Sequence, residues 1–321
     1  MSEESGRSGI TLTVKKRRAS ADSVVVFELR SLTGARLPSW QPGAHIDLLL
    51  PGGLIRQYSL CGDPRDHGSY RIAVLLEENG RGGSRFIHDE LRAGDEVRIR
   101  GPRNQFGLVS SEKYIFIAGG IGITPILPML SAADAAGADW RLHYGGRYRR
   151  SMAFLDALEQ WPSSHIDLYP QDEVGLINLE PVIEDAKADP RVHLYCCGPG
   201  ALINAVQAAV GAVPPSHLHV ELFRPTDDAV GPALPFDVEL VRSGLHLTVP
   251  GDTSLLETLL AAGVDVQYSC ESGTCGTCEM TVLEGEVDHR DTLLTTEERH
   301  ANNTIYPCVS RSKGDRLVLD A

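Results

Sequence analysis

Four of the seven cysteines in this 321-residue chain have the spacing of metal ligands. Cys270, Cys275 and Cys278 lie within nine residues, and Cys308 follows after 29 intervening residues. A loop that supplies three thiolates and a later strand that returns the fourth are typical of plant-type [2Fe–2S] clusters. The residues between the clustered cysteines are small, and glycines let backbone N–H groups approach the cluster sulfurs. The spacing therefore favours a [2Fe–2S] centre.

A structural zinc site and disulfides are the two other interpretations of these cysteines. Structural zinc sites more often use two CxxC pairs, whereas Cys275 and Cys278 form the single pair in this set and Cys308 stands alone. Disulfides are disfavoured by the odd cysteine count and by the first ten residues, which have neither the basic nor the apolar region of a secretory signal. Zinc is therefore the second candidate. We expect Cys61 and Cys196, which have no partner at ligand spacing, to be free buried thiols.

Two glycine-rich segments have the composition of phosphate-binding turns. GGIGITP (119–125) follows an apolar run typical of a strand and opens a predicted helix, although it lacks the GxGxxG fingerprint. NGRGGS (79–84) precedes a second predicted helix, RFIHDEL. Glycines allow a close approach of phosphate, and the N–H groups at a helix start attract anions. An ordinary strand-to-helix turn capped by Ser84 is the alternative for the second segment.

Two short motifs accompany these turns. RQYSL (56–60) is predicted to be a strand on which Arg56 and Tyr58 face the same side. Alone, it would indicate no more than an exposed arginine and a core tyrosine. CGP (197–199) ends another predicted strand, where ligands of open α/β sheets bind. A nucleophilic role for Cys197 is disfavoured because the sequence indicates no histidine or asparagine partner.

The motifs fall into segments with different periodicities. Residues 1–108 contain short alternating or β-branched runs separated by turn signals, which predicts a small antiparallel barrel. Residues 109–224 alternate strand-like and helix-like runs, which predicts a parallel sheet with helices on its faces. Residues 225–235 are rich in Pro, Asp and Ala, and this composition predicts a linker. Residues 236–321 begin with a predicted hairpin and helix and contain the cysteine cluster.

Composition and charge exclude several classes of protein. The chain has 42% hydrophobic and 23% charged residues, as soluble globular proteins do. Its most apolar stretch is broken by glycines and prolines and is too short to span a bilayer, so we expect a cytoplasmic protein. The net charge of −13 argues against nucleic-acid binding. Residues 236–321 contain 15 Asp/Glu and 6 Lys/Arg, so −9 of that charge lies there, which favours a basic partner surface.

The motifs occur together, in an order and spacing similar to those of the phthalate dioxygenase reductase family, and the resemblance covers nearly all of the chain. It implies a multidomain protein: an FMN-binding antiparallel β-barrel domain (1–108), a ferredoxin-reductase-like α/β NADH-binding domain (109–224), a linker (225–235) and an α+β, β-grasp plant-type [2Fe–2S] ferredoxin domain (236–321). Vanillate demethylase and carnitine monooxygenase reductases are similar in domain order.

The resemblance also implies roles for individual residues. Arg56 would meet the flavin phosphate, Tyr58 would lie along the isoalloxazine, and Ser59 would hydrogen-bond near its N5. Cys197 would lie near the nicotinamide C4, across from Thr124, so the expected catalytic residues are Ser59, Thr124 and Cys197. The other expected flavin and nicotinamide contacts are Ala73, Val74, Arg81, Gly82, Gly83, Ser84, Gly120, Gly122, Pro125, Gly198, Pro199 and Phe223. For Phe223, a core position on an edge strand is the alternative.

The function implied is electron transfer from NADH to FMN, then to the [2Fe–2S] cluster, and finally to a partner Rieske-type oxygenase or demethylase. Arg147, Arg149 and Arg150 follow the strand LHYGG, where a 2′-phosphate could be recognised, but solvated arginines are the usual interpretation and NADH is the expected donor. We expect a monomer that binds neither nucleic acid nor membrane. A haem-thiolate monooxygenase is an alternative partner. A non-enzymatic redox sensor or ferredoxin carrier is disfavoured because all the motifs are intact.

Overall fold

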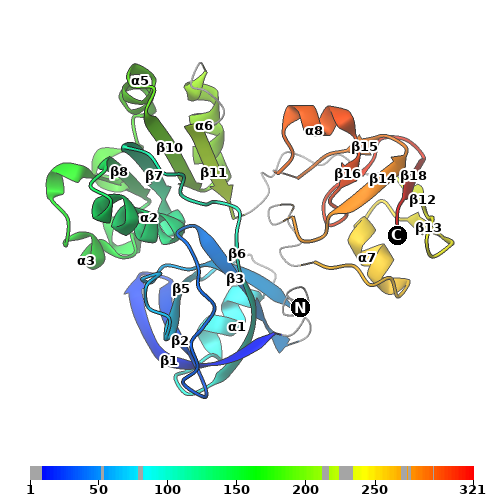
Figure 1. Ribbon diagram of the computed structural model, residues 1–321, viewed down its shortest axis with the longest axis horizontal. Coiled ribbons are helices and arrows are strands. Elements are labelled where there is room, and N and C mark those ends of the chain that lie inside the picture. Colours follow the sequence, from blue (N-terminus) through cyan, green and yellow to red (C-terminus); the bar gives the residue numbers. More distant parts are fainter. Residues whose placement is uncertain are drawn as a thin grey trace. The chain divides into compact units, whose positions relative to one another are not determined.

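The chain divides into two units, Met1–Glu221 and Leu222–Ala321 (Figure 1). The computed structural model describes residues 9–51, 54–78, 82–211, 217–223, 234–268, 273, 276–291 and 293–321. Within these ranges, no helix has the length and apolar character needed to cross a membrane.

The first part of unit one is the predicted antiparallel barrel. Its described strands follow the order β4-β3-β6-β1-β2-β5. The two edge strands meet where the backbone N–H of Cys61, two residues after β4, donates to Arg71 O on β5 at 2.9 Å. Alternate residues such as Leu12 and Val14 are buried in the core, as a period of two requires. The elements are β1 (Ile10–Ala21), β2 (Val24–Ser31), β3 (Ala44–Leu49), β4 (Ile55–Ser59), β5 (Ser69–Leu75), α1 (Gly83–Asp89) and β6 (Glu96–Asn104).

The second part of unit one is a sheet in the order β11-β10-β7-β8-β9, covered by helices (Figure 1). Strands β10, β7, β8 and β9 are parallel, which confirms the predicted α/β class. The strands are β7 (Lys113–Gly119), β8 (Asp139–Gly146), β9 (Ile166–Pro170), β10 (Val192–Gly198) and β11 (Leu218–Leu222). The helices are α2 (Ile123–Ala135), α3 (Leu155–Leu158), α4 (Gln171–Val174), α5 (Leu179–Ala188) and α6 (Gly200–Val210), with 3-10 turns η2 (Gly120–Gly122), η3 (Arg149–Ser151) and η4 (Ser163–His165).

Helix α3 is shorter than the run MAFLDALEQ predicts. Met152 and Phe154 are buried, and Phe154 has a left-handed φ of 64° that cannot belong to an α-helix. The backbone N–H of Phe154 donates to Ser20 Oγ of the barrel at 3.1 Å. These apolar residues therefore fill the junction between barrel and sheet, and the helix begins only at Leu155.

The barrel and the parallel sheet share one apolar core. Val26 and Ala73 of the barrel belong to the same buried cluster as Ile123 and Ile126 of α2. A backbone hydrogen bond from Asp22 N to Arg150 O, 2.9 Å long, also crosses the junction. This shared core brings the start of α2, where GGIGITP lies, next to barrel strands β2 and β5.

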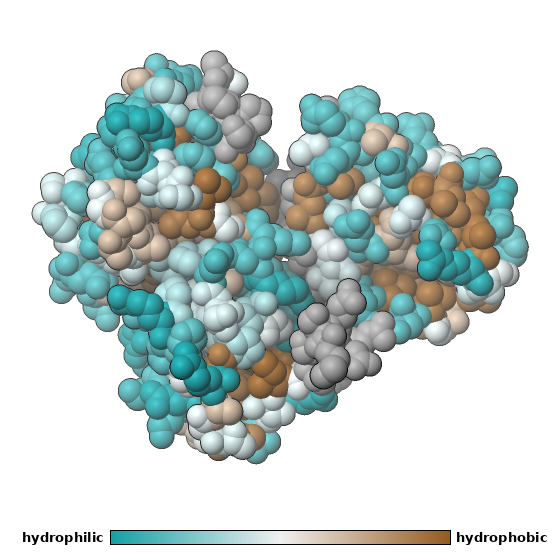
Figure 2. Space-filling model, viewed as in Figure 1, coloured by the Kyte–Doolittle hydropathy of each residue, from teal (hydrophilic) through white to brown (hydrophobic). Residues whose placement is uncertain are grey.

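Unit two has a mixed sheet in the order β13-β12-β18-β14-β16, with β12 and β18 parallel, as in the predicted β-grasp class. Ser254 caps α7 in a reciprocal pair with Glu257, each side chain accepting from the other's backbone N–H. Figure 2 shows apolar surface broken by hydrophilic residues on the visible face of this unit. Its elements are β12 (Phe236–Leu240), β13 (Leu245–Val249), α7 (Leu255–Ala261), β14 (Met280–Glu284), β15 (Val287–Asp288), α8 (Thr296–Ala301), β16 (Thr304–Ile305), β17 (Arg311–Ser312) and β18 (Arg316–Leu319).

Candidate functional site

The two expected flavin motifs meet at the start of α1. A β-carbon added to Gly83 would lie 2.6 Å from Arg56 Nε and 2.7 Å from Arg56 Cγ, so the arginine side chain crosses directly over this glycine. Gly82 precedes the helix with a left-handed φ of 81° and provides no side-chain cap. Ser84 does not cap the helix either, because its Oγ accepts the N–H of Glu77 at 3.0 Å. This corner places a guanidinium where it could hold a flavin phosphate.

Tyr58 and Ser59 continue the same strand beyond Arg56. Ser59 is buried. Burial raises the pKa of the Tyr58 phenol well above its usual value. The positive charge of Arg56 opposes that rise, and the negative charge of Glu77 adds to it. The phenol is therefore neutral at physiological pH and presents an uncharged ring and hydroxyl, as a surface against an aromatic cofactor would need.

Ala73 and Val74 on β5 face opposite sides of the sheet. Ala73 lies in the core shared with α2, whereas Val74 is completely buried in the barrel core. His88, from α1, forms a 2.9 Å hydrogen bond with the carbonyl oxygen of Val74 and ties the helix to the strand. Of these two expected flavin contacts, only Ala73 points its side chain towards the nicotinamide-binding half of the unit.

The two expected nicotinamide motifs also come together. A β-carbon at Gly122 would lie 2.2 Å from Cys197 O and 2.7 Å from Gly198 N. Strands β7 and β10, which carry these motifs at their carboxyl ends, are parallel neighbours. From β7 the sheet continues to β8 and β9 on one side and to β10 and β11 on the other, so the strand order reverses between β7 and β10. Open α/β sheets bind ligands at such a reversal. Thr124 is buried, and its hydroxyl donates to Ile121 O at 2.9 Å, which stabilises the turn.

Glu221 is a site residue that the sequence analysis missed. The buried Cys197 thiol donates to Glu221 Oε2 across a distance of 3.9 Å. Burial raises the pKa of Glu221 to about 8, and burial followed by the glutamate's charge raises the pKa of Cys197 well above its usual value. The thiol therefore stays protonated and is not a nucleophile. The signal available in the sequence was a carboxylate between the apolar residues Val220 and Leu222.

Three histidines line the neighbouring stretch of β10 and β11. The rings of His193 and His217 are stacked 4.5 Å apart, and His193 Nδ1 and His219 Nε2 share a 2.9 Å hydrogen bond. His219 also stacks on Tyr195 at 4.3 Å. Burial, with His193 and His217 adding to it, lowers the pKa of His219 to about 4. Burial also lowers the pKa of His193, so His193 and His219 are neutral at physiological pH. No motif in the sequence indicated that the three histidines would meet.

Two of the four predicted cluster ligands are described, and they lie together. Cys278 Sγ and Cys308 Sγ are 3.4 Å apart, and both thiols are buried. A disulfide would need about 2.05 Å, whereas this separation suits two thiolates bound to one tetrahedral metal atom. A β-carbon at Gly273, whose φ is 68°, would lie 2.6 Å from Val309 Cγ2, so Gly273 packs tightly against the residue that follows the fourth cysteine.

Cys61 and Cys196 are buried free thiols, as predicted. Phe223 is 37% exposed, which does not support the alternative of a core position. Three predicted site residues lie outside the described part of the chain: Arg81, Cys270 and Cys275.

Comparisons with known proteins agree with this architecture. Residues 10–107 match the oxidoreductase FAD-binding domain, residues 116–208 the oxidoreductase NAD-binding domain, and residues 238–313 the 2Fe-2S iron-sulfur cluster binding domain. The fold and these matches define an oxidoreductase that combines flavin, NAD and 2Fe-2S domains.

The chain belongs to the phthalate dioxygenase reductase family. It is 40% identical over 318 residues to phthalate dioxygenase reductase of Burkholderia cepacia, covering 97% of each chain. A solved structure of a phthalate dioxygenase reductase matches with a TM-score of 0.77 and 38% identity over 98% of both chains. An intact self-sufficient cytochrome P450 monooxygenase matches with a TM-score of 0.83 and 44% identity, covering 98% of this chain. The present chain spans only 41% of that protein.

Proposed function

We propose that this protein is the reductase component of a Rieske-type oxygenase or demethylase system, and that it acts in the cytoplasm. It takes electrons from NADH and delivers them, through FMN and a [2Fe–2S] cluster, to the oxygenase component. The proposal rests above all on one observation: the nicotinamide corner at Gly122 and Cys197 shares a core with the barrel that carries Arg56 and Tyr58. The full-length similarity to phthalate dioxygenase reductase supports it.

The bound groups supply the redox chemistry, because a flavin can accept a hydride and release electrons singly while a [2Fe–2S] cluster carries one. The protein itself positions the flavin and the cluster and shields them from solvent. We propose that Arg56, lying over Gly83, holds the flavin phosphate and that neutral Tyr58 and buried Ser59 line the ring. FMN is proposed over FAD on the family resemblance, although the matching domain model is named for FAD.

The nicotinamide would bind where β7 and β10 end. Gly120, where an added β-carbon would meet no atom within 4 Å, leaves room for the pyrophosphate, and Gly122 allows the close approach of Cys197. Thr124 keeps the turn closed through its bond to Ile121 O. Cys197 is completely buried and holds its proton, so it would place an uncharged thiol, not a thiolate, behind this corner. The remaining contacts proposed in this corner are Pro125, Gly198, Pro199 and Phe223. On the flavin side they are Ala73, Val74, Arg81, Gly82 and Ser84.

The cluster would be bound by Cys270, Cys275, Cys278 and Cys308, of which the last two lie at ligand separation. We propose domain boundaries at 108 and 224, with a linker over 225–235. The 15 acidic residues of the ferredoxin domain, against 6 basic ones, would steer it to a basic face of the oxygenase. Such docking should weaken with added salt.

A single substitution tests this electron path. Cys308→Ser should leave NADH-driven reduction of ferricyanide, which the flavin can perform, and abolish reduction of the protein acceptor cytochrome c. Cys61→Ser, which changes a buried thiol of the barrel, is the control and should retain both activities. The purified wild-type protein should also show flavin and cluster absorbance that NADH bleaches. If both activities survive in Cys308→Ser, or if the wild-type protein is colourless and holds one zinc ion, the proposal is wrong.

A second candidate function is electron delivery to a haem-thiolate monooxygenase. It is favoured by the match to the self-sufficient cytochrome P450 monooxygenase, 44% identical over 98% of this chain. The two functions differ in the partner protein. The protein encoded by the neighbouring reading frame would therefore decide between them. A CxH…CxxH pattern in that protein indicates a Rieske oxygenase. A haem-thiolate protein encoded there indicates the second candidate.

A further inference from the structure

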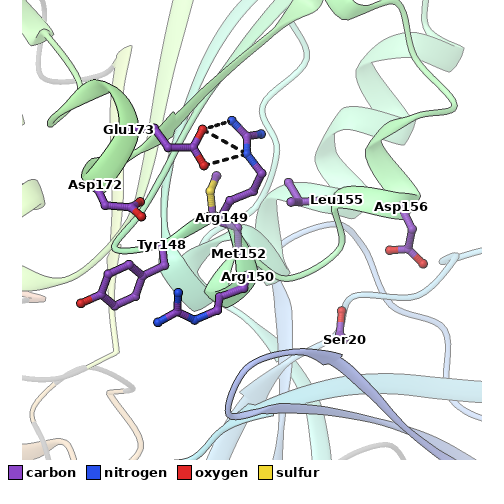
Figure 3. Close-up of a pocket in the computed structure, with 9 residues that line it drawn as sticks. All are labelled: Ser20, Tyr148, Arg149, Arg150, Met152, Leu155, Asp156, Asp172 and Glu173. Carbon is purple, nitrogen blue, oxygen red and sulfur yellow. Dashed lines mark hydrogen bonds and ion pairs between the residues drawn. The ribbon is translucent and has the colours of Figure 1, made fainter.

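A pocket of about 560 Å³ lies beside the carboxyl ends of β8 and β9 in unit one. It is lined by residues of the turn η3 after β8, by the start of α4 after β9 and by Ser20 of the barrel (Figure 3). Strand β8 is the parallel neighbour of β7, which carries the glycine-rich turn. In dinucleotide-binding sheets the adenosine ribose lies at the end of this neighbouring strand. The pocket is therefore placed to receive the adenosine end of the nicotinamide nucleotide.

Both arginines that line the pocket already have carboxylate partners. Arg149 donates two hydrogen bonds to Glu173, from Nε to Oε1 at 3.0 Å and from Nη2 to Oε2 at 2.6 Å. Figure 3 shows the guanidinium turned towards the carboxylate. Arg150 Nε lies 2.9 Å from Asp22 Oδ2, and its guanidinium lies 4.3 Å from the centroid of the Tyr148 ring.

The remaining charges in the pocket wall are negative. Asp172 lies beside Glu173 on α4, and Asp156 lines the opposite side (Figure 3). Asp156 is 3.8 Å from Arg18 Nη1, a distant and exposed pair. Among the described residues that line this pocket, carboxylates outnumber arginines and no arginine lacks a carboxylate partner. An added phosphate would meet repulsion here, whereas ribose hydroxyls would meet hydrogen-bond acceptors.

We propose that the Arg149–Glu173 ion pair makes this protein specific for NADH against NADPH. An arginine at this position can recognise the 2′-phosphate of NADPH through its planar fork. In this protein the donors of the Arg149 guanidinium are already bonded to Glu173. A 2′-phosphate would therefore have to displace the glutamate, and it would then lie next to the negative charges of Glu173 and Asp172. The 2′-hydroxyl of NADH requires no displacement. Glu173 is thus a specificity residue that acts through Arg149.

The ionisation of Glu173 is consistent with this role. Hydrogen bonding to Arg149 holds the pKa of Glu173 below its usual range, so the carboxylate is charged throughout the physiological range. The side chains of Arg149 and Glu173 are 48% and 43% exposed, and water screens pairs of this kind. The discrimination should therefore be measurable but moderate, and removing the glutamate should release Arg149 without disturbing the fold.

Two mononucleotides test the inference on the full-length holoprotein. Adenosine 2′,5′-bisphosphate carries the 2′-phosphate and 5′-AMP lacks it, and isothermal titration measures the affinity of each. Glu173→Gln should bind the bisphosphate about fivefold tighter than the wild type does and 5′-AMP equally well. The double variant Glu173→Gln/Arg149→Gln should lose this gain. Glu184→Gln is the matched control, because Glu184 pairs with Lys187 on α5 at 3.0 Å and lies outside the pocket.

The outcomes separate this inference from the proposed function on which it rests. The inference is overturned if Glu173→Gln gains no more affinity for the bisphosphate than Glu184→Gln does, or if the double variant keeps the gain. In either case NADH would still reduce the flavin of the wild type, and the proposed function would stand. If the wild type binds neither 5′-AMP nor NADH, the proposed function itself fails and the inference fails with it.

Discussion

Alanine in place of Gly122 should disrupt the corner where the nicotinamide is proposed to bind. The new β-carbon would lie 2.2 Å from Cys197 O, whereas ordinary contact begins at 3.4 Å, and the nearest atoms all belong to the backbone of Cys197 and Gly198. No flexible side chain can move aside, so β10 and the start of α2 must separate by about 1 Å. Overpacking of this kind costs about 1–3 kcal/mol.

Two measurements follow from this displacement. The apparent Tm of the flavin-loaded protein should fall by about 2–12 °C, given the size of unit one. The kcat/KM for NADH with ferricyanide as acceptor should fall by roughly 100-fold, because a shift of about 1 Å in a positioned reactant has that effect. The flavin content should be unchanged, since the barrel motifs are not touched.

Gly107→Ala is the matched control for this experiment. Its β-carbon would lie 3.7 Å from the nearest atom, the Nδ2 of Asn104, which is an ordinary contact. This variant should match the wild type in Tm and in kcat/KM. If Gly122→Ala behaves like Gly107→Ala in both measurements, the close approach of GGIGITP to CGP is not a requirement of the site and the reasoning is refuted.

Two further predictions concern the flavin corner and the histidines. Gly83→Ala should push Arg56 away from the start of α1, because the new β-carbon would lie 2.6 Å from its Nε. The flavin-to-protein ratio after purification should drop and recover only with excess FMN; a stoichiometric flavin content would contradict the proposed phosphate site. His219, with a pKa of about 4 when folded and an ordinary value of 6.5 when unfolded, binds a proton more readily in the unfolded chain. Stability should therefore decline as the pH falls from about 6.5 to about 4, by up to roughly 3 kcal/mol. His219→Gln should flatten this decline in urea unfolding curves measured at each pH, and an unchanged slope would show that His219 does not cause it.

Much of the domain architecture could be predicted from local sequence signals. The change from a period of two to alternating strands and helices is visible without any tertiary contact, because side-chain direction follows backbone geometry over a few residues. The spacing of the four cysteines is likewise a property of the chain, and the short separation of Cys278 and Cys308 agrees with it. Glycine-rich turns such as GGIGITP were recognisable because few other residues allow their close backbone approach.

Sequence by itself therefore determined the three domains, their cofactor classes and the segments that carry the site. Only the tertiary structure decided which side chains meet: Cys197 with Glu221, His193 with His219, and Arg149 with Glu173. The partners in each pair lie 24 to 26 residues apart on different elements. Their contact depends on strand order and packing across the sheet, which local periodicity does not encode. The same limit applies to the run MAFLDALEQ, because its first residues fill the junction with the barrel instead of forming a helical turn and α3 begins only at Leu155.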